Sequence, residues 1–481
     1  MTNDNIVTNI PLCVDLDGTL VKTDLLFESF LSLIKLNLLY LFLVPLWWLK
    51  GKANFKHQIA KRVDLDVNSL PYNQNFIKYL SAETDRGRLL ILATASNEKY
   101  AIQIANKIGI FSEVLASNQH INLSRKVKAD LLIKKYGKQK FDYAGNSSDD
   151  LIVWEHSRKA IVVNADRNII RKVEKITTVQ KIVEQKKQGV LLFLKAIRIH
   201  QWVKNVLIFI PIVTAHQITN FKIDALGFWA FLSFSFCSSG IYVLNDLIDL
   251  ESDRLNEYKK NRPFASADLS IQFGLTIIPL FLTISFALAV ILPPDFMLAI
   301  ACYLVFTTMY TFYFKKIIML DVIVLAFLYT MRIIAGHEAT GIPYSFWLFA
   351  FSLFLFFSLA LLKRYSELYN LQKDNNQLHA WGRGYYIGDI SHISQIGSSS
   401  GLIAILILAL YINSREVMAL YQTPMLLWLI CPLMLYWISR VWLKAGRGEI
   451  HEDPIIFAFK DKVSYILAVF VFLIIAVATY L

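Results

Sequence analysis

The chain has 481 residues, of which 55% are apolar and 18% are charged, and its mean hydropathy is +0.45. Soluble globular proteins carry about 25% charged residues, so the composition excludes a protein that is soluble throughout. The net charge of +12 suits nucleic acid, anionic lipid or phosphorylated substrates as partners. Nucleic acid is excluded because the basic residues of the second half lie between hydrophobic segments.

The composition changes near residue 190. Residues 1–190 are dense in charge, and short apolar runs alternate with helical patterns, which predicts an α/β domain. Residues 195–481 are predicted to form an all-α membrane bundle of about nine transmembrane helices, because a span needs about 20 apolar residues. The apolar segments are 203–215, 226–245, 272–292, 296–313, 317–335, 345–362, 399–413, 424–439 and 463–480. Two of them, 203–215 and 399–413, are short for a span.

Lysine and arginine are distributed unevenly among the connecting loops. The loops after the even-numbered segments hold 15 of them, and the other four loops hold 2. These residues favour the cytoplasmic side of a membrane. We therefore expect an integral inner-membrane protein whose N-terminal domain and charged loops face the cytoplasm, with the C-terminus on the opposite side.

The first motif lies at the end of an apolar run, in PLCVDLDGTL (11–20). We expect this run to be a strand that presents Asp15 and Asp17 at the edge of a sheet. One carboxylate can attack phosphorus, and the other can protonate the leaving oxygen. Gly18 permits a tight turn beside them. The motif indicates phosphoryl-transfer chemistry, although a strand-to-turn cap with buried acids has the same pattern.

Three further segments follow in order: LLILAT, which ends in Thr94; VKADLL, with Lys128; and KFDYAGNSSDDL, with Asp150. The four segments together resemble the haloacid dehalogenase phosphohydrolase superfamily, which implies a Rossmann-like fold with a cap inserted at about 20–88. The resemblance implies that Asp15 is the nucleophile, Asp17 the general acid and base, and Thr94 and Lys128 phosphate-binding residues. It also implies Mg²⁺ held by Asp15, Asp17 and Asp150.

The fourth of these segments departs from the family pattern. It usually reads Gly-Asp, but here it reads Gly145-Asn146. An amide oxygen can ligate Mg²⁺ but brings no charge, so the affinity for the metal should fall. An active phosphatase and a degenerate, regulatory or scaffolding domain both remain open. Ser96 is a weaker candidate for the role of Thr94.

The stretch 30–48, FLSLIKLNLLYLFLVPLWW, is apolar and long enough to cross a membrane. A single crossing would place Asp15 and Thr94 in different compartments, which the motif order excludes. We therefore expect a membrane-associated interfacial or shallow re-entrant helix pair. The alternative is the buried core of the cap.

A second acidic constellation follows the second apolar segment, in GIYVLNDLIDLESDRLNEYKKNRPFASA (240–267). Asp246, Asp249 and Asp253 share one face of a helix by their spacing. Clustered carboxylates repel one another unless a cation lies among them, and acidic groups in a membrane protein are functional candidates. The arrangement suits Mg²⁺ that bridges to a diphosphate. The alternative is a solvated helix end.

This N-D-x-x-D-x-x-x-D pattern resembles the UbiA superfamily of intramembrane prenyltransferases, which are nine-helix bundles that bind a diphosphate through Mg²⁺. RIHQWVKN (198–205), LALLKRYSEL (359–368) and EDPIIFAFKD (452–461) are similar to one branch, the polyprenyl-phosphate (decaprenyl-phosphate) phosphoribosyltransferases. The resemblance implies catalytic roles for Asp246 and Asp249, with Asp253 as a further metal ligand. It also implies substrate contacts for Lys204, Asn245, Arg254, Lys259, Arg262, Tyr310, Lys315, Asp321, Arg332, Lys363, Arg364 and Arg383.

The resulting hypothesis is a transfer of 5-phosphoribose from 5-phosphoribosyl diphosphate to a polyprenyl phosphate, with the N-terminal domain removing the 5-phosphate of the product. The loop after the sixth segment lacks a second D-x-x-x-D motif and is basic, which favours an acceptor that itself carries phosphate. One alternative is an aromatic polyprenyltransferase that uses a polyprenyl diphosphate. Another is a phosphatase for a soluble metabolite, with the spans as its anchor. The pair Asp321 and Arg332 could also be a structural pair within one span.

Overall fold

The computed structural model describes residues 10–185, 189–257, 259–373, 384–450 and 453–480. The chain divides into two compact units. The first contains residues 1–197 and 243–277, and the second contains residues 198–242 and 278–481. The segment with the aspartate motif therefore groups with the N-terminal part of the chain.

The first unit is built on a six-stranded parallel sheet in the order β3-β2-β1-β4-β5-β6. Leu12 of β1 is in register with Leu90 of β2 on one side and with Asp142 of β4 on the other. The carboxyl ends of these three strands therefore meet at one edge. The strands are β1 (Leu12–Val14), β2 (Leu90–Asn97), β3 (Glu113–Ser117), β4 (Asp142–Gly145), β5 (Lys159–Ala165) and β6 (Thr178–Gln185).

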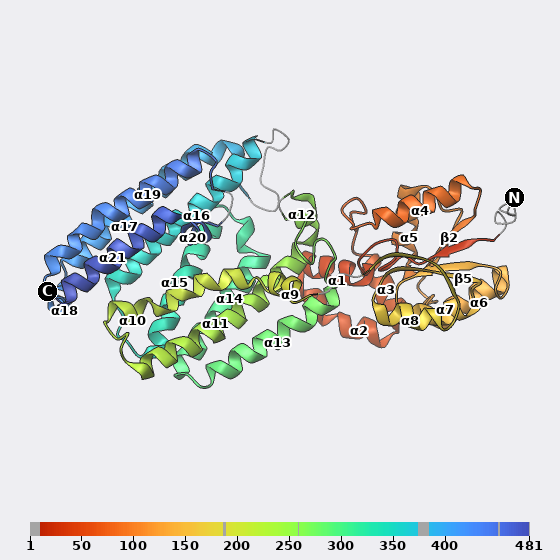
Figure 1. Ribbon diagram of the computed structural model, residues 1–481, viewed down its shortest axis with the longest axis horizontal. Helices are drawn as coiled ribbons and strands as arrows, with labels where there is room; N and C mark the ends of the chain where they lie inside the picture. The colour runs from red at the N-terminus through yellow and green to blue at the C-terminus, as the bar shows by residue number, and fades with distance from the viewer. Residues whose placement is uncertain (1–9, 186–188, 258, 374–383, 451–452, 481) are drawn as a thin grey trace. The chain divides into compact units, whose positions relative to one another are not determined.

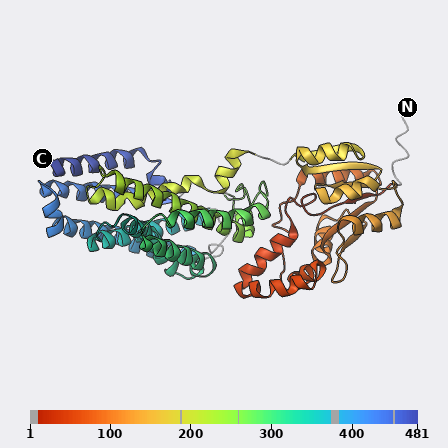
Figure 2. The same cartoon turned by 90° about the horizontal axis from the view of Figure 1, so that it is seen from below.

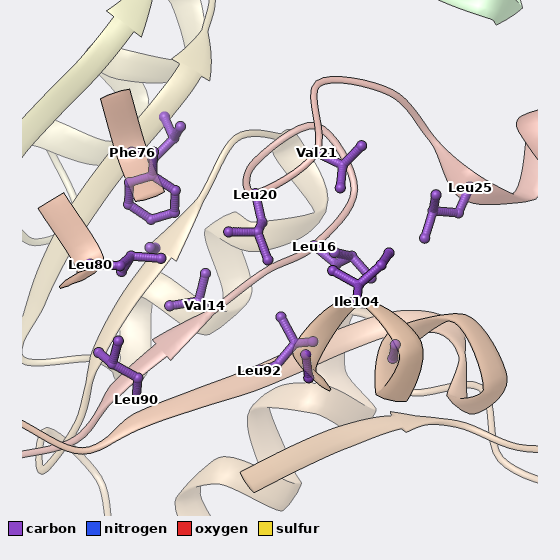
Figure 3. Close-up of a cluster of buried hydrophobic side chains, with 14 of the residues drawn as sticks. Val14, Leu16, Leu20, Val21, Leu25, Phe76, Leu80, Leu90, Leu92 and Ile104 are labelled. Carbon is purple, nitrogen blue, oxygen red and sulfur yellow. The ribbon is translucent and has the colours of Figure 1, made fainter. Parts of the chain in front are cut away.

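Helices cover both faces of this sheet, and apolar side chains fill the space between. On one face, Val14 and Leu92 pack against Phe76 and Leu80 of α4 and against Ile104 of α5, as Figure 3 shows. The other face is covered by α6, α7 and α8. The helices are α4 (Gln74–Asp85), α5 (Glu98–Ile108), α6 (Arg125–Tyr136), α7 (Leu151–His156) and α8 (Arg167–Glu174).

The insertion between β1 and β2 is helical and has a small core of its own. It contains α1 (Leu25–Leu36), the 3₁₀ turn η2 (Leu38–Phe42), α2 (Val44–Leu49) and α3 (Lys52–Ala60), followed by α4. Figure 2 shows this segment, in red to orange, to one side of the sheet. The apolar stretch 30–48 is divided among α1, η2 and α2, and none of these has the length of a span.

The segment 243–277 contains the end of α11 (Phe221–Ile248), α12 (Leu250–Leu255) and the start of α13 (Ile271–Ala289). We expected one helix face to carry the aspartates through this region. The helix is interrupted at Asp249, which precedes α12 and lies outside helical backbone geometry. The interruption separates Asp246 from Asp253.

The second unit is a bundle of long apolar helices, several of which lie side by side in Figure 1. Within the described ranges, eight helices are long and apolar enough to cross a membrane. The count rises to nine if a bent pair, Val190–Ala196 with Ile199–Thr214, forms one span. The short segment 399–413 lies within a full-length helix, whereas 203–215 belongs to the bent pair.

The helices of the second unit after α11 and α13 are α14 (Pro294–Phe312), α15 (Leu320–Thr340), α16 (Phe346–Lys373), α17 (Ile390–Ile412), α18 (Arg415–Leu420), α19 (Ile430–Gly446), α20 (Pro454–Ala458) and α21 (Lys462–Tyr480). The turns η4 (Ile199–Phe209) and α10 (Ile210–Thr214) precede α11, and α9 (Val190–Ala196) joins the units. An α/β domain followed by a helical membrane domain is the predicted fold class, and it is confirmed.

Candidate functional site

Asp15 lies directly after β1 and is held by a buried ammonium group. Lys128 Nζ, on α6, donates to Asp15 Oδ1 at 2.7 Å and to the Tyr143 hydroxyl at 2.8 Å. Burial raises the pKa of Asp15 to about 7, against the opposing effect of Lys128. Burial disfavours the charge on Lys128, but the carboxylates of Asp15 and Asp150 outweigh it and raise the pKa of Lys128. The predicted nucleophile and the predicted phosphate-binding lysine are therefore in direct contact.

Asp17 is fixed by one backbone donor and one hydroxyl. Its Oδ1 accepts from Leu25 N at 2.9 Å, and its Oδ2 accepts from Ser96 Oγ at 2.5 Å. Burial raises the pKa of Asp17 to about 6, so its carboxyl group can hold a proton near neutral pH. Thr94 is fully buried, and its Oγ1 accepts from Ser96 N at 3.0 Å. Ser96, which the sequence favoured less than Thr94, is thus the hydroxyl that contacts Asp17.

The turn after Asp15 brings the fourth motif close to the first. Gly18 has φ of +74°, and a Cβ atom at this position would lie 2.0 Å from Asn146 Nδ2. The Asn146 side chain therefore faces the turn that carries Asp17. Asp150 points instead into the protein. Its Oδ2 accepts from Asn146 N, Ser147 N and Ser147 Oγ, and its Oδ1 accepts from Tyr143 Oη at 2.7 Å.

These groups border a cavity of about 740 Å³ within the first unit. Its polar wall includes Asp15, Asp17, Ser96, Lys128 and Asn146. Lys56 of α3 also borders it and was not singled out from the sequence, because nothing in the local pattern distinguishes it from other lysines. Lys56 Nζ donates to Ala95 O at 2.5 Å and to Asn122 Oδ1 at 3.0 Å, and burial lowers its pKa.

The donors around Asp15 suit a hard cation only in part. No group of three His, Cys, Asp or Glu side chains within the described ranges is placed to hold a metal ion. Both oxygens of Asp150 already accept from the protein's own donors, so the metal role predicted for it would need these bonds to break. Asp15, Asp17 and the amide oxygen of Asn146 are the remaining oxygen donors. Such a set fits Mg²⁺, which binds few protein oxygens and keeps several waters.

In the aspartate segment, two of the three predicted carboxylates share an arginine. Arg262 Nη1 lies 3.1 Å from Asp246 Oδ1 and 2.6 Å from Asp253 Oδ2. Both aspartates are buried, and burial raises the pKa of Asp253 against the effect of Arg262. A divalent cation among these oxygens would replace or join the arginine in balancing their charge. Asp249 is less buried, at the break between α11 and α12.

Other predicted substrate contacts of this segment differ in their surroundings. Arg254 Nη2 pairs with Glu28 Oε1 of α1 at 2.5 Å, and its Nε donates to Ala265 O at 3.0 Å. Its charge is therefore already balanced within the unit. Lys259 is half-buried in the turn after α12, and Asn245 lies one residue before Asp246 at the end of α11.

In the second unit, Asp453 joins two of the predicted basic residues. Its Oδ2 lies 2.8 Å from Lys204 Nζ and 3.1 Å from Lys363 Nζ, and the Tyr329 hydroxyl donates to it at 3.2 Å. The two ammonium groups outweigh burial and hold the pKa of Asp453 well below its usual range. Asp453 was missed as a site residue, although it lies in the quoted string EDPIIFAFKD.

Arg332 completes a buried cationic cluster around Tyr329. Its guanidinium carbon and Lys204 Nζ each lie 5.5 Å from the Tyr329 ring centre. Arg332 donates to Asn205 Oδ1 at 2.9 Å, to Tyr303 Oη at 3.2 Å and to Leu328 O at 2.6 Å, which are all neutral acceptors. We call Lys204, Arg332, Lys363 and Asp453 the buried cation cluster. It holds three cations and one carboxylate.

The possible pairing of Asp321 with Arg332 is wrong. Asp321 Oδ2 accepts from Arg364 Nε at 2.5 Å, and its Oδ1 accepts from Tyr385 Oη at 2.5 Å. Arg364 also pairs with Glu367 at 2.6 Å and donates to Tyr310 Oη at 3.0 Å. The three-turn spacing along α15 places Asp321 and Arg332 on similar faces of the helix. Asp321 nevertheless pairs with Arg364 of the neighbouring helix α16.

This second network balances the charge of Arg364 fully, since two carboxylates surround it. The contact of Arg364 with Asp321 joins α16 to α15, and the predicted substrate contact of Arg364 stays a prediction. Lys315 lies in the short turn η5 (Phe314–Lys316) after α14. Arg383, the last predicted substrate contact, lies outside the described residues.

Each half of the chain has similar solved structures, with TM-scores below 0.5. The N-terminal region resembles a HAD family hydrolase from Salmonella enterica (TM-score 0.28, 11% identity, 38% of this chain and 71% of that chain). The membrane region resembles a UbiA homolog from Archaeoglobus fulgidus bound to DMAPP and Mg²⁺ (TM-score 0.45, 17% identity, 59% and 99%).

Similar sequences occur in several bacteria. An uncharacterised protein of Sinorhizobium fredii is 34% identical over 465 residues, which is 95% of this chain and 88% of that protein. Nodulation protein NoeC of Azorhizobium caulinodans is 34% identical over 57% of this chain and 89% of its own length. Decaprenyl-phosphate phosphoribosyltransferase of Mycobacterium tuberculosis is 33% identical over 179 residues, 36% of this chain and 59% of its own.

The model of the UbiA prenyltransferase family matches residues 208–460, and the apolar helices show that the protein is integral to a membrane. The chain belongs to the UbiA prenyltransferase family, and it is a membrane transferase of the prenyltransferase type.

Proposed function

We propose that the membrane domain transfers 5-phosphoribose from 5-phosphoribosyl diphosphate to a polyprenyl phosphate. The observation that carries the proposal is the buried cation cluster, in which Asp453 pairs with Lys204 and with the partly exposed Lys363, while Arg332 packs, like Lys204, on the Tyr329 ring and donates to neutral acceptors. Excess buried charge is costly unless a ligand of opposite sign balances it. Phosphorylated substrates would provide that charge, and the similarity to decaprenyl-phosphate phosphoribosyltransferases supports phosphoribosyl diphosphate and a polyprenyl phosphate as the two substrates.

In the transfer step, the bond between ribose C1 and the diphosphate oxygen breaks, and its electron pair leaves with the diphosphate. Asn245, Asp246, Asp249 and Asp253 would hold Mg²⁺, which stabilises the charge of the departing diphosphate. Positive charge develops at C1, and an oxygen of the polyprenyl phosphate forms the new bond there. No general base is needed because the phosphate nucleophile is already ionised.

We further propose that the N-terminal domain removes the 5-phosphate from the product. An Asp15 oxygen attacks phosphorus, the ester bond breaks, and Asp17 gives its proton to the departing ribose oxygen. Water then attacks the aspartyl phosphate while Asp17 takes back a proton, so that inorganic phosphate leaves and Asp15 is restored. Lys128 holds Asp15 in place and balances phosphate charge.

The loop charges support an inner-membrane location in which the N-terminal domain and the basic loops face the cytoplasm and the C-terminus faces the other side. Phosphoribosyl diphosphate is highly charged and soluble in water. The transferase site would therefore have to be open to the cytoplasm.

The test uses purified protein in lipid with Mg²⁺, a polyprenyl phosphate and phosphoribosyl diphosphate labelled in the ribose. We expect the label to appear in the lipid fraction. No label in the lipid, together with prenylation when a polyprenyl diphosphate and 4-hydroxybenzoate are supplied, would replace this function with aromatic prenyl transfer.

A further inference from the structure

The insertion helices α1 and α2 and the turn η2 expose many large apolar side chains. We call this set the cap apolar face: Leu36, Leu39, Leu41, Phe42, Leu43, Leu46, Trp48 and Leu49. Phe42 is 78% exposed and Leu49 is 82% exposed. Single exposed apolar residues are ordinary in proteins, but a contiguous set marks a surface that binds a membrane or another protein.

The charges beside this face favour a bilayer as the partner. Lys50 and Lys52 are exposed at the end of α2 and the start of α3, and Lys35 lies in the last turn of α1. Apolar side chains flanked by lysines are typical of segments that lie in the interface of an anionic membrane. The spans of the same chain keep a bilayer within constant reach, which raises its effective concentration.

The cavity of the first unit has an apolar wall made by the same helices. Phe30 of α1, Val44 and Trp48 of α2, and Phe55 of α3 line it together with Asp15 and Lys128. Trp48 belongs to both surfaces, because it lines the cavity and is 55% exposed, and its ring packs on Phe55 at 5.3 Å. Apolar surface is therefore continuous from the cavity to the cap apolar face.

We propose that this cavity takes a phosphomonoester carried on a membrane lipid, whose chain leaves the cavity past Trp48 toward a bilayer in contact with the cap apolar face. The proposal deepens the phosphatase function above and rests on it. The charged wall would hold the phosphate and the sugar, and the apolar wall would hold the first part of the chain.

The size of the cavity agrees with a site that holds the phosphate, the sugar and only the first part of the lipid chain. Its volume of about 740 Å³ is that of a site for a small ligand and cannot enclose a long lipid. The rest of a polyprenyl chain would have to remain in the bilayer. A soluble sugar phosphate would fill the charged part and leave the apolar wall in water, so the site should favour the lipid over the free sugar phosphate.

The test compares three substrates with the full-length protein in vesicles that contain phosphatidylglycerol. They are farnesyl-phosphoryl-ribose 5-phosphate, dioleoyl phosphatidate and soluble ribose 5-phosphate, and phosphate release gives kcat/KM for each. We expect the farnesyl substrate to exceed ribose 5-phosphate by about tenfold or more. The triple variant Leu39→Ser, Phe42→Ser, Leu49→Ser changes exposed residues that do not line the cavity.

We expect this variant to lose roughly tenfold in kcat/KM on the farnesyl substrate and to keep its rate on ribose 5-phosphate. The control Leu89→Ser removes a side chain that is 51% exposed before β2, away from the cavity, and should change neither rate.

Equal kcat/KM for the farnesyl substrate and ribose 5-phosphate would overturn the lipid preference and leave the phosphatase function standing. Hydrolysis of phosphatidate alone would support lipid entry and overturn the ribosyl product. Hydrolysis of none would overturn both.

Discussion

The cavity of the first unit contains Asp15, Asp17 and Asp150 with the ammonium group of Lys128 in contact, whereas the cluster in the second unit contains two ammonium groups on Asp453 and a guanidinium group on neutral acceptors. In the first arrangement, burial raises the pKa of Asp17, which suits a proton donor, and the ammonium group of Lys128 favours the charged, nucleophilic form of Asp15 against the effect of burial. Among the described residues, the second arrangement has more cations than carboxylates. The comparison indicates that one site is suited to breaking a phosphate ester and the other to holding a phosphate.

The largest effect is expected at the nucleophile. Asp15→Asn keeps the shape of the side chain but removes its negative charge, so phosphate release should fall by roughly 10⁴-fold or more. Phosphoribosyl transfer should be unchanged. Asp85→Asn, at an exposed aspartate in the last turn of α4 that does not line the cavity, is the control and should change neither rate. Phosphate release that survives Asp15→Asn would remove the chemical role of the first site.

Asp246→Ala should lower phosphoribosyl transfer and leave phosphate release unchanged. Removing a carboxylate that would hold the Mg²⁺ of the departing diphosphate should cost about 10²–10³-fold in rate, which labelled product in the lipid fraction would measure. Release of phosphate from ribose 5-phosphate should continue. Glu251→Ala is the control, because Glu251 lies on the same segment, is half-exposed and makes a long ion pair of 4.0 Å with Lys35. If Asp246→Ala also stopped phosphate release, the two sites would not be separable.

Asp453→Asn tests the excess of charge in the cation cluster. The variant leaves Lys204 and Lys363 without a carboxylate, and breaking a buried ion pair costs about 3–5 kcal/mol of unfolding free energy. Thermal unfolding in detergent should shift strongly downward and recover in part when phosphoribosyl diphosphate is added. Asp295→Asn, in the exposed first turn of α14, is the control. An unshifted melting temperature would show that Asp453 does not balance these lysines.

Asn146→Asp adds a carboxylate beside Asp15 and Asp17 with almost no change in shape. The Mg²⁺ concentration for half-maximal phosphate release should fall by about tenfold, because an amide oxygen is replaced by a charged one. Ser147→Ala, next in the chain, is the comparison and should not increase metal affinity. A rise in the Mg²⁺ requirement of Asn146→Asp would place the metal elsewhere.

The smallest effect is expected at Asp461, which has two hydrogen bonds from Arg440 at 2.7 and 2.9 Å. These bonds lower the pKa of Asp461 to about 2. Its contribution to stability is present above the unfolded pKa, near 4, and is lost as pH falls toward 2. Asp461→Asn should cost about 2 kcal/mol at pH 7, measured by thermal unfolding. A cost as large as that of Asp453→Asn would remove the contrast between the two pairs.

The sequence predicted the α/β domain and the helical bundle, and it named Asp15 and Lys128 as members of one site, because each depends on a local pattern with a known place at a strand end or on a helix. The phosphate-binding hydroxyl was assigned to Thr94, with Ser96 as the weaker candidate, since the motif marks the strand end but not which of two neighbouring hydroxyls points into the cavity. Ser96 is the one that does.

In the bundle, local spacing was a weaker guide. Asp321 and Arg332 lie on the same helix, yet Asp321 pairs with Arg364 of the next helix, and Arg332 binds neutral oxygens. Asp453, which joins Lys204 and Lys363, is separated from them by 249 and 90 residues. Partners this far apart are set by how helices pack, which a single sequence does not reveal.

The most direct test uses phosphoribosyl diphosphate with tritium in the ribose and ³²P in the 5-phosphate, added to the protein in lipid with Mg²⁺ and polyprenyl phosphate. We predict that tritium enters the lipid fraction while ³²P is released as inorganic phosphate, and that both labels stay in the lipid with Asp15→Asn. Absence of tritium from the lipid would contradict phosphoribosyl transfer. Both labels staying in the lipid with the unmodified protein would contradict the phosphatase step alone.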